Sequence, residues 1–85
     1  MPTLHVYSRR GCHLCDVLVE ELLALVRGRL AVEVRDIDTR EDWQQRFDLR
    51  VPVVEYQGKV VCRYRLDRQA VAAILATHGG AGGEQ

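Results

Sequence analysis

The chain has 85 residues, which is enough for one domain but not for two. Its twelve basic and twelve acidic side chains cancel, so it lacks the positive charge typical of proteins that bind nucleic acids or anionic membranes. The first residues contain no export signal, and the longest apolar run, residues 22–26, is far too short to span a bilayer. We therefore expect a cytoplasmic monomer made of one domain, residues 1–78, and a flexible glycine-rich tail, residues 79–85.

The first third of the chain predicts a strand, a helix and a second strand. Residues 3–7 are rich in strand formers, and we interpret His5 among them as an ordinary strand residue rather than a ligand. Apolar side chains recur at helical spacing over residues 12–27, and Gly28 is expected to end this helix. Residues 30–34 then alternate as expected for a strand.

A second, shorter helix is predicted over residues 40–47. Thr39 and Asp42 resemble a capping box, in which two side chains satisfy the free backbone N–H groups of the first turn. Trp43 and Phe47 stand four residues apart, so they share one face of this helix. We expect that face to pack into the core.

A hairpin follows. Residues 51–56 and 59–64 are two runs of strand-forming residues, and Gln57-Gly58 between them is typical of a tight turn. Proline cannot donate a hydrogen bond inside a sheet, so Pro52 is expected at the very start of its strand.

Asp67 is a candidate cap for a last helix over residues 68–78. The apolar stripe of this helix consists of Ala70, Val71, Ile74 and Leu75. The element order is therefore β-α-β-α-β-β-α. Two crossover connections favour parallel first strands, whereas the tight turn makes the last pair antiparallel. We expect an α/β fold with a four-stranded mixed sheet and helices on both faces.

Two cysteines lie where the first predicted strand leads into the first helix. Residues three apart in a helical turn share one face, and Cys12 and Cys15 would then have Cα atoms about 5.5 Å apart, as a disulfide requires. Cys12 starts the helix, where free N–H groups and the helix dipole favour a thiolate, and Arg9 and Arg10 add positive charge. In a reducing cytoplasm such a pair is typical of a catalytic or metal-binding site.

The element order, the CxxC pair and a Val-Pro dipeptide together resemble the thioredoxin fold, and more closely its glutaredoxin branch, over residues 3–78. The specific points of resemblance are residues 7–15, Asp36-Ile37-Asp38, Val51-Pro52 and Gln57-Gly58-Lys59. Thioredoxins usually carry Trp before the first cysteine and Gly-Pro between the pair, whereas this chain has Gly11 before Cys12 and His13-Leu14 between the cysteines. The departure argues against a true thioredoxin.

The resemblance implies a thiol–disulfide oxidoreductase that reduces protein or small-molecule disulfides. Cys12 would be the nucleophile that attacks the substrate disulfide, and Cys15 the resolving thiol. His13 and Arg10 are candidates for tuning the pair, because positive charge stabilises a thiolate. The alternative interpretation of His13 is a solvated polar residue of the first helical turn.

On the substrate side, the resemblance implies that Val51-Pro52 is a cis-proline loop that faces the cysteines. The backbone of Val51 would pair with an extended substrate chain. Arg50 and Arg9 are further candidates for substrate binding, Arg50 toward a carboxylate, although a solvated arginine is the alternative there. The implied partners are a disulfide-containing protein or small molecule, and glutathione or a reductase as the electron donor.

Glutaredoxins usually carry Gly-Gly just after the hairpin, where their backbone approaches glutathione, but Cys62 and Arg63 stand at about those positions here. These side chains would crowd the tripeptide, which argues against glutathione as the reductant. We expect no tightly bound cofactor and no metal site, and we interpret Cys62 as a small buried apolar residue. Two other functions stay open: a metal or iron–sulfur binding module, and an adaptor with a vestigial site.

Overall fold

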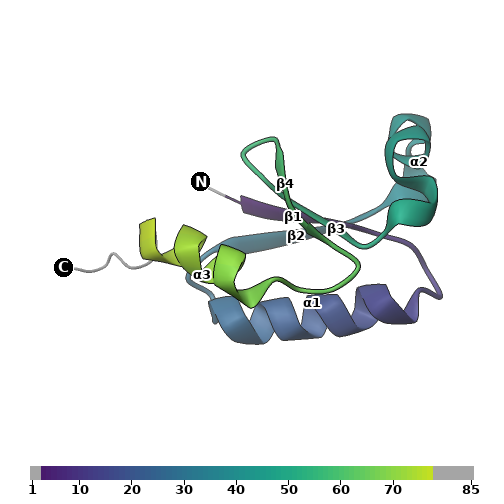
Figure 1. The fold of residues 1–85 in the computed structure, drawn as a ribbon. Helices are drawn as coiled ribbons and strands as arrows, with labels where there is room; N and C mark the ends of the chain where they lie inside the picture. Colours follow the sequence, from purple (N-terminus) through teal and green to yellow (C-terminus); the bar gives the residue numbers. More distant parts are fainter. Residues whose placement is uncertain (1–2, 78–85) are drawn as a thin grey trace.

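The structure is a computed structural model that describes residues 3–77, and its elements follow the predicted order (Figure 1). The strands are β1 (Thr3–Ser8), β2 (Ala31–Asp36), β3 (Val53–Tyr56) and β4 (Lys59–Arg63). The helices are α1 (His13–Val26), α2 (Glu41–Phe47) and α3 (Arg68–Thr77), with 3₁₀ turns η1 (Ile37–Thr39) and η2 (Asp48–Arg50) beside α2. None of these helices has the length and apolar character needed to cross a membrane. The predicted last helical residue, 78, and the predicted tail, 79–85, lie outside the described residues.

The four strands form one mixed sheet in the order β2-β1-β3-β4. β1 and β2 are parallel, as the crossover through α1 predicts, with Val6 opposite Val34. β3 runs antiparallel to β1, so the second connection does not add another parallel strand. The reason is the position of α2, which stands at the end of the sheet where β2 ends and β3 begins (Figure 1). Because this connection does not return along the sheet, β3 runs back in the opposite direction.

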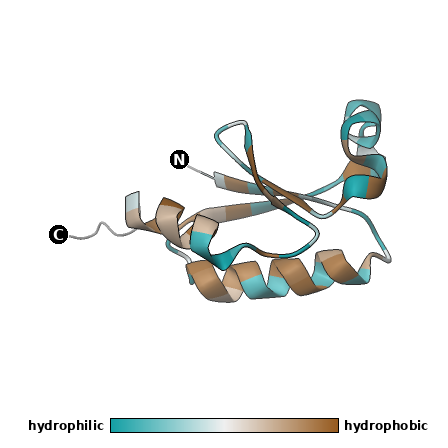
Figure 2. Ribbon diagram, in the orientation of Figure 1, coloured by the Kyte–Doolittle hydropathy of each residue, from teal (hydrophilic) through white to brown (hydrophobic). Residues whose placement is uncertain are grey.

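The main core lies between the sheet and the two longer helices, α1 and α3. Leu18 and Leu22 of α1 and Val71 of α3 are fully buried against Leu4 and Val54 of the sheet. Their spacing along the helices is the predicted one, and Figure 2 shows the apolar residues concentrated along α1 and the strands. Large buried side chains of this kind each contribute about 1.5–3 kcal/mol to the stability of the fold.

A second, smaller cluster lies on the other face of the sheet and includes α2. Phe47 of α2 is buried with Ile37, Val53 and Tyr7, and the Tyr7 and Phe47 rings stack with their centroids 4.1 Å apart. Trp43 packs against this cluster but is only partly buried. The predicted buried face of α2 is therefore confirmed for Phe47 and in part for Trp43, and helices on both faces of the sheet are confirmed.

The predicted capping box of α2 is wrong. Thr39 belongs to η1, and its hydroxyl donates to the carbonyl of Asp36 at 2.6 Å instead of capping the helix. Arg40 occupies the N-cap position without a side-chain cap, and Asp42 pairs with the Arg40 guanidinium at 2.9 Å. The chain leaves β2 through a 3₁₀ turn closed by Asp36 and Thr39, so the hydroxyl is already engaged where the helix begins.

The other predicted ends agree with the structure more closely. Asp67 caps α3, because its Oδ1 accepts the backbone N–H of Ala70 at 3.0 Å. Gln57 and Gly58 have φ angles of +52° and +80°, as both central residues of a type I′ turn do. Pro52 lies just outside the sheet rather than within the predicted strand, since β3 begins at the next residue.

A buried polar network, which the sequence analysis missed, joins the sheet to α2. Glu55 lies in the middle of β3 and is only 6% exposed. Its carboxylate accepts a hydrogen bond from the Tyr7 hydroxyl at 3.2 Å and pairs with Arg46 of α2 at 2.8 Å. The same hydroxyl accepts a hydrogen bond from Arg35 at 2.9 Å. Tyr7 is thus the centre of the network and a main contact of the second cluster.

Replacing Tyr7 with phenylalanine keeps the stacked ring but removes both hydrogen bonds of its hydroxyl. We expect Tyr7→Phe to lower the free energy of unfolding by about 2 kcal/mol, because both partners carry charge and Glu55 is buried. The midpoint temperature should fall by roughly 10 °C for a domain of this size. The control is Tyr64→Phe, whose lost hydroxyl makes no side-chain hydrogen bond within residues 3–77. Equal midpoints for the two variants in thermal unfolding would contradict a stabilising network.

Candidate active site

Cys12 occupies the N-cap position of α1, directly before the first helical residue. Its carbonyl accepts the N–H of Asp16 at 3.1 Å, and its Sγ accepts the N–H of Cys15 at 3.2 Å. The sulfur therefore takes the place of the oxygen in an ordinary capping side chain. Cys12 lies where the sequence predicts it, beside free N–H groups and the positive end of the helix dipole.

Cys12 and Cys15 are joined by a disulfide, and their Cα atoms are 5.2 Å apart. Gly11, with a φ of +76°, makes the turn that leads into the pair, a conformation that favours glycine. Cys15 faces the core and is 1% exposed, whereas Cys12 is only partly buried. Of the two cysteines, Cys12 is therefore the more accessible from solvent.

The loop before β3 lies at the same end of the sheet as the cysteine pair (Figure 1). Tyr7 near the end of β1 is opposite Val53, so the chain that leaves β1 passes beside the residues that precede β3. The Val51–Pro52 peptide bond is cis, as the resemblance implied. Pro52 is buried, and its carbonyl accepts the backbone N–H of Tyr64 at 2.8 Å, which ties this loop to the segment after β4.

Arg9, a predicted substrate-binding residue, is engaged by two carboxylates of its own chain. Its guanidinium donates to both carboxylate oxygens of Asp38 at 3.2 Å and lies 3.5 Å from the Asp48 carboxylate. The hydrogen bond to Asp38 raises the pKa of Arg9. Arg9 therefore connects the loop before α1 to the turns on both sides of α2, and its role toward a substrate stays a prediction.

Three other predicted residues are open to solvent. Arg10, His13 and Arg50 are exposed, and their side chains make no hydrogen bond or ion pair within residues 3–77. Arg10 and His13 flank Cys12 along the chain, and Arg50 directly precedes the cis peptide bond. The structure brings all three to the reactive end of the sheet, while their tuning and binding roles stay predictions.

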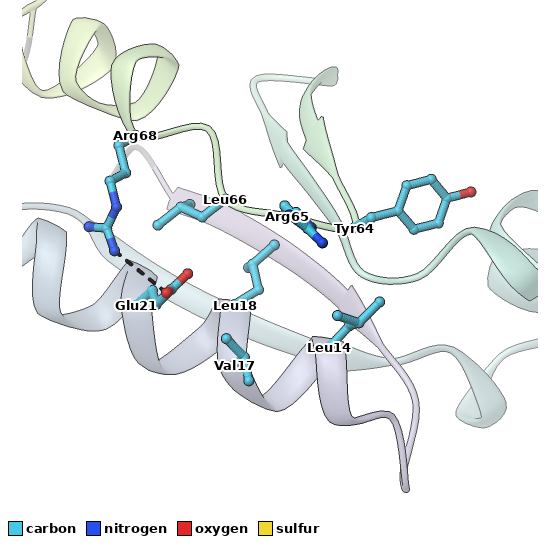
Figure 3. A pocket seen from close by; sticks show the side chains of 8 residues that line it. All are labelled: Leu14, Val17, Leu18, Glu21, Tyr64, Arg65, Leu66 and Arg68. Atoms are coloured by element: carbon cyan, nitrogen blue, oxygen red, sulfur yellow. Dashed lines mark ion pairs between the residues drawn. The ribbon is translucent and has the colours of Figure 1, made fainter.

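A groove of about 420 Å³ runs along α1, between this helix and the segment that follows β4 (Figure 3). Leu14, which stands between the two cysteines, and Leu18 point from α1 toward the segment that follows β4 (Figure 3). Tyr64 and Leu66 line the opposite side, and an ion pair between Glu21 and Arg68 closes the far end. We call this feature the α1 groove; its residues are Leu14, Val17, Leu18, Glu21, Tyr64, Arg65, Leu66 and Arg68.

Tyr64 is the residue of the α1 groove that sequence reasoning missed. We predicted it as the last residue of a strand, but β4 ends at Arg63 and Tyr64 has a φ of +68°. Residues other than glycine rarely adopt this backbone conformation, which costs about 1–3 kcal/mol where it occurs. Nothing in a Tyr signals such a bend, so only the structure reveals it.

Cys62 packs against the main core and does not line the α1 groove. Neither does Arg63, and the crowding of glutathione by these two side chains, which the resemblance implied, stays a prediction. The predicted burial of Cys62 holds in part, because its side chain is partly buried. Burial raises the pKa of its thiol above the ordinary value.

With the Cys12–Cys15 disulfide intact, Cys62 is the only thiol that can react. Its raised pKa leaves less thiolate at neutral pH, so alkylation by iodoacetamide should be slower than that of a free cysteine. The rate should rise with pH up to values above the ordinary cysteine pKa of about 8.5. Mass spectrometry of the oxidised protein against pH gives the rates. A profile equal to that of free cysteine would contradict the burial of this thiol.

No group of three or more His, Cys, Asp or Glu side chains within residues 3–77 is arranged to hold a metal ion. The site therefore consists of a disulfide at a helix start, a cis-proline loop beside it and the α1 groove. In this arrangement Cys12 is partly accessible, whereas Cys15 is buried.

Comparisons with known proteins agree with this description. The profile of the glutaredoxin-like domain family (DUF836) matches residues 3–76. Protein Ne2328 from Nitrosomonas europaea is 34% identical, with a TM-score of 0.75, and the match covers 86% of this chain and 89% of that one. Target protein XcR50 from X. campestris is 32% identical, with a TM-score of 0.67, over 87% of this chain and 96% of that one.

Thioredoxin 1 from Thermosipho africanus is also similar, with a TM-score of 0.61 and 13% identity over 88% of this chain and 96% of that one. At that identity the likeness concerns the fold alone, which is the thioredoxin fold. No curated protein matches the sequence. The family profile and the two relatives above 30% identity show that this chain belongs to the glutaredoxin-like domain family.

Proposed function

We propose that this protein is a thiol–disulfide oxidoreductase in which Cys12 and Cys15 alternate between dithiol and disulfide. The observation that carries the proposal is the asymmetry of the pair. Cys12 Sγ caps a helix and is accessible, whereas Cys15 is one turn deeper and 1% exposed. One sulfur is thus suited to attack a substrate and the other to displace it.

The chemistry proceeds in two exchange steps. First, the Cys12 thiolate attacks one sulfur of the substrate disulfide; a mixed disulfide forms, the substrate S–S bond breaks, and the other substrate sulfur leaves and takes up a proton. Second, Cys15 loses its proton and attacks Cys12 Sγ, which forms the intramolecular disulfide and releases the second substrate thiol. Two electrons pass from the cysteine pair to the substrate, and an external thiol reductant returns them.

In the reduced protein, we expect the pKa of Cys12 to lie below the ordinary value of about 8.5. The N–H of Cys15 and the dipole of α1 stabilise the thiolate at Cys12, while Cys15 itself is buried in the first turn of the helix. The rate of attack on a disulfide should therefore fall as the pH is lowered through the Cys12 pKa, since the thiol is unreactive. The absorbance of the thiolate, recorded against pH in a Cys62→Ser background, measures the pKa of Cys12. An ordinary pKa for Cys12 would remove the case for an activated nucleophile.

We further propose that glutathione is a poor reductant for this site. Support comes from Tyr64, which lines the α1 groove and whose N–H is bound to the carbonyl of Pro52. A large aromatic residue there leaves less room for a tripeptide than a small residue would. Another dithiol reductant then keeps the pair reduced.

The test is turnover of a generic disulfide, hydroxyethyl disulfide, with three reductants: glutathione with its reductase, thioredoxin reductase, and dithiothreitol. We expect turnover with dithiothreitol and with thioredoxin reductase, and little turnover with glutathione. Absence of turnover with every reductant would refute the oxidoreductase, and efficient turnover with glutathione would refute only the second proposal.

A further inference from the structure

The α1 groove has exposed apolar side chains close to the cysteine pair in the chain. Leu14 is 46% exposed and Tyr64 is 44% exposed, and Val17, one helical turn after Leu14, is exposed as well. Leu14 lies between Cys12 and Cys15 in the chain, so the groove begins in the first turn of α1, close to the cysteine pair, although neither cysteine lines it. Apolar surface next to a reactive group is suited to contact the side chains that flank a substrate disulfide.

The same end of the molecule carries unpaired positive charge. Arg65 lines the α1 groove, and Arg63 lies opposite Val53 at the start of β3, beside the cis-proline loop. Neither makes an ion pair within residues 3–77, and the same holds for Arg10 and Arg50 at this end. The five arginines that do form ion pairs in this range are Arg9, Arg35, Arg40, Arg46 and Arg68.

The acidic groups around the groove offset this charge only in part. Glu21, at the far end, is paired with Arg68, and Asp67 caps α3 through the N–H of Ala70. Asp16 lines a separate hollow on the side of Cys15 and Val34, away from Tyr64 and Arg65. The whole chain is neutral, but its reactive end presents an apolar groove bordered by free guanidinium groups.

We propose that the α1 groove binds a polypeptide in which the reactive half-cystine is flanked by apolar residues and, beyond them, by carboxylates. The proposal rests on the proposed oxidoreductase function and names its substrate class. The apolar flank packs on Leu14 and Tyr64. The carboxylates face Arg65, which lines the groove, and Arg63, which lies outside it beside the cis-proline loop. Charge complementarity of this kind acts mainly on the rate of encounter, so it should weaken as salt is added.

The test uses the full chain, reduced in advance, and four substrates. Three are peptides with the same intermolecular disulfide and different flanks: apolar and acidic, apolar and basic, or polar and acidic. The fourth is hydroxyethyl disulfide, which is uncharged and has no flank. The rate constant of the first exchange is measured by rapid quenching. At about 20 mM salt we expect the apolar-acidic peptide to react about tenfold faster than the apolar-basic one, and the ratio should approach one at about 0.5 M salt.

Two double variants test whether Arg63 and Arg65 cause the preference for the acidic peptide. Arg63→Gln with Arg65→Gln should reduce the tenfold preference to about twofold, because the groups that face the carboxylates are gone. The matched control is Arg27→Gln with Arg29→Gln, two exposed arginines at the opposite end of α1 that also lack an ion pair within residues 3–77. This control should keep the preference of the unaltered protein.

Three results would overturn the inference while leaving the oxidoreductase intact: equal rates for all three peptides, a preference that salt does not change, or hydroxyethyl disulfide reacting as fast as the apolar-acidic peptide. The peptide and salt comparisons use the unaltered protein, so they hold even if a variant fails to fold. Failure to reduce hydroxyethyl disulfide as well as the peptides would instead overturn the proposed function itself.

Discussion

Replacing Cys12 with serine should abolish disulfide reduction, with a loss of at least about a thousandfold in the rate with any reductant. Serine fits the N-cap position of α1 as well as cysteine does, so the helix should remain. Its hydroxyl, however, is not ionised at neutral pH and forms no mixed disulfide. Turnover of hydroxyethyl disulfide with dithiothreitol, corrected for the uncatalysed reaction, gives the rate.

The matched control is Cys62→Ser, which removes the third thiol. Cys62 packs against the main core away from the α1 groove, so this variant should keep the full rate. Substantial reduction by Cys12→Ser would show that another group is the nucleophile. A large loss in Cys62→Ser at unchanged folding would show that the third thiol takes part.

The second large effect is expected for Cys15→Ser. The mixed disulfide on Cys12 should then persist, because the resolving thiol one turn away is missing. Reduction of protein disulfides should fall about a hundredfold, since each turnover now requires an external thiol to release the product. Mass spectrometry of the protein after one equivalent of a peptide disulfide should show a covalent peptide adduct on Cys12 in this variant and none in the unaltered chain.

The glutathione-dependent activity of Cys15→Ser tests whether glutathione is a poor reductant for this site. If Tyr64 obstructs the tripeptide, Cys15→Ser should show little glutathione-dependent activity, and Cys15→Ser with Tyr64→Gly should gain it. Glycine also suits the φ of +68° at this position, so the second change does not strain the backbone. Strong glutathione-dependent turnover by Cys15→Ser alone would place the protein among ordinary monothiol-competent glutaredoxins and contradict our proposal.

Most of the fold was predictable because its signals are local. The spacing of Leu18 and Leu22 marks the buried face of α1, and the Gln57-Gly58 pair fixes the hairpin. Cys12 could be placed at a helix start because a strand pattern ends shortly before it and a helical pattern follows. These features depend on residues within a turn or two of each other, which is the range that periodicity and capping rules cover.

Features that depend on distant pairs were out of reach. A glutamate such as Glu55 is ordinarily expected at an exposed position of a strand. Its burial here is stabilised by Tyr7 and by Arg46, which lie on other elements. The engagement of Arg9 by Asp38 likewise joins residues far apart in the chain. The wrongly predicted cap at Thr39 has a local cause, since the hydroxyl donates to the carbonyl of Asp36 within the 3₁₀ turn instead.

The most direct test of the central claim is a single turnover of the reduced Cys62→Ser protein. One equivalent of peptide disulfide is added, the reaction is quenched with acid, and intact mass and peptide mapping are recorded. We predict that one substrate disulfide is consumed per protein, that both thiols disappear together, and that the product carries a Cys12–Cys15 disulfide. A protein that keeps both thiols, or loses them without consuming substrate, would contradict the two-electron exchange at this pair.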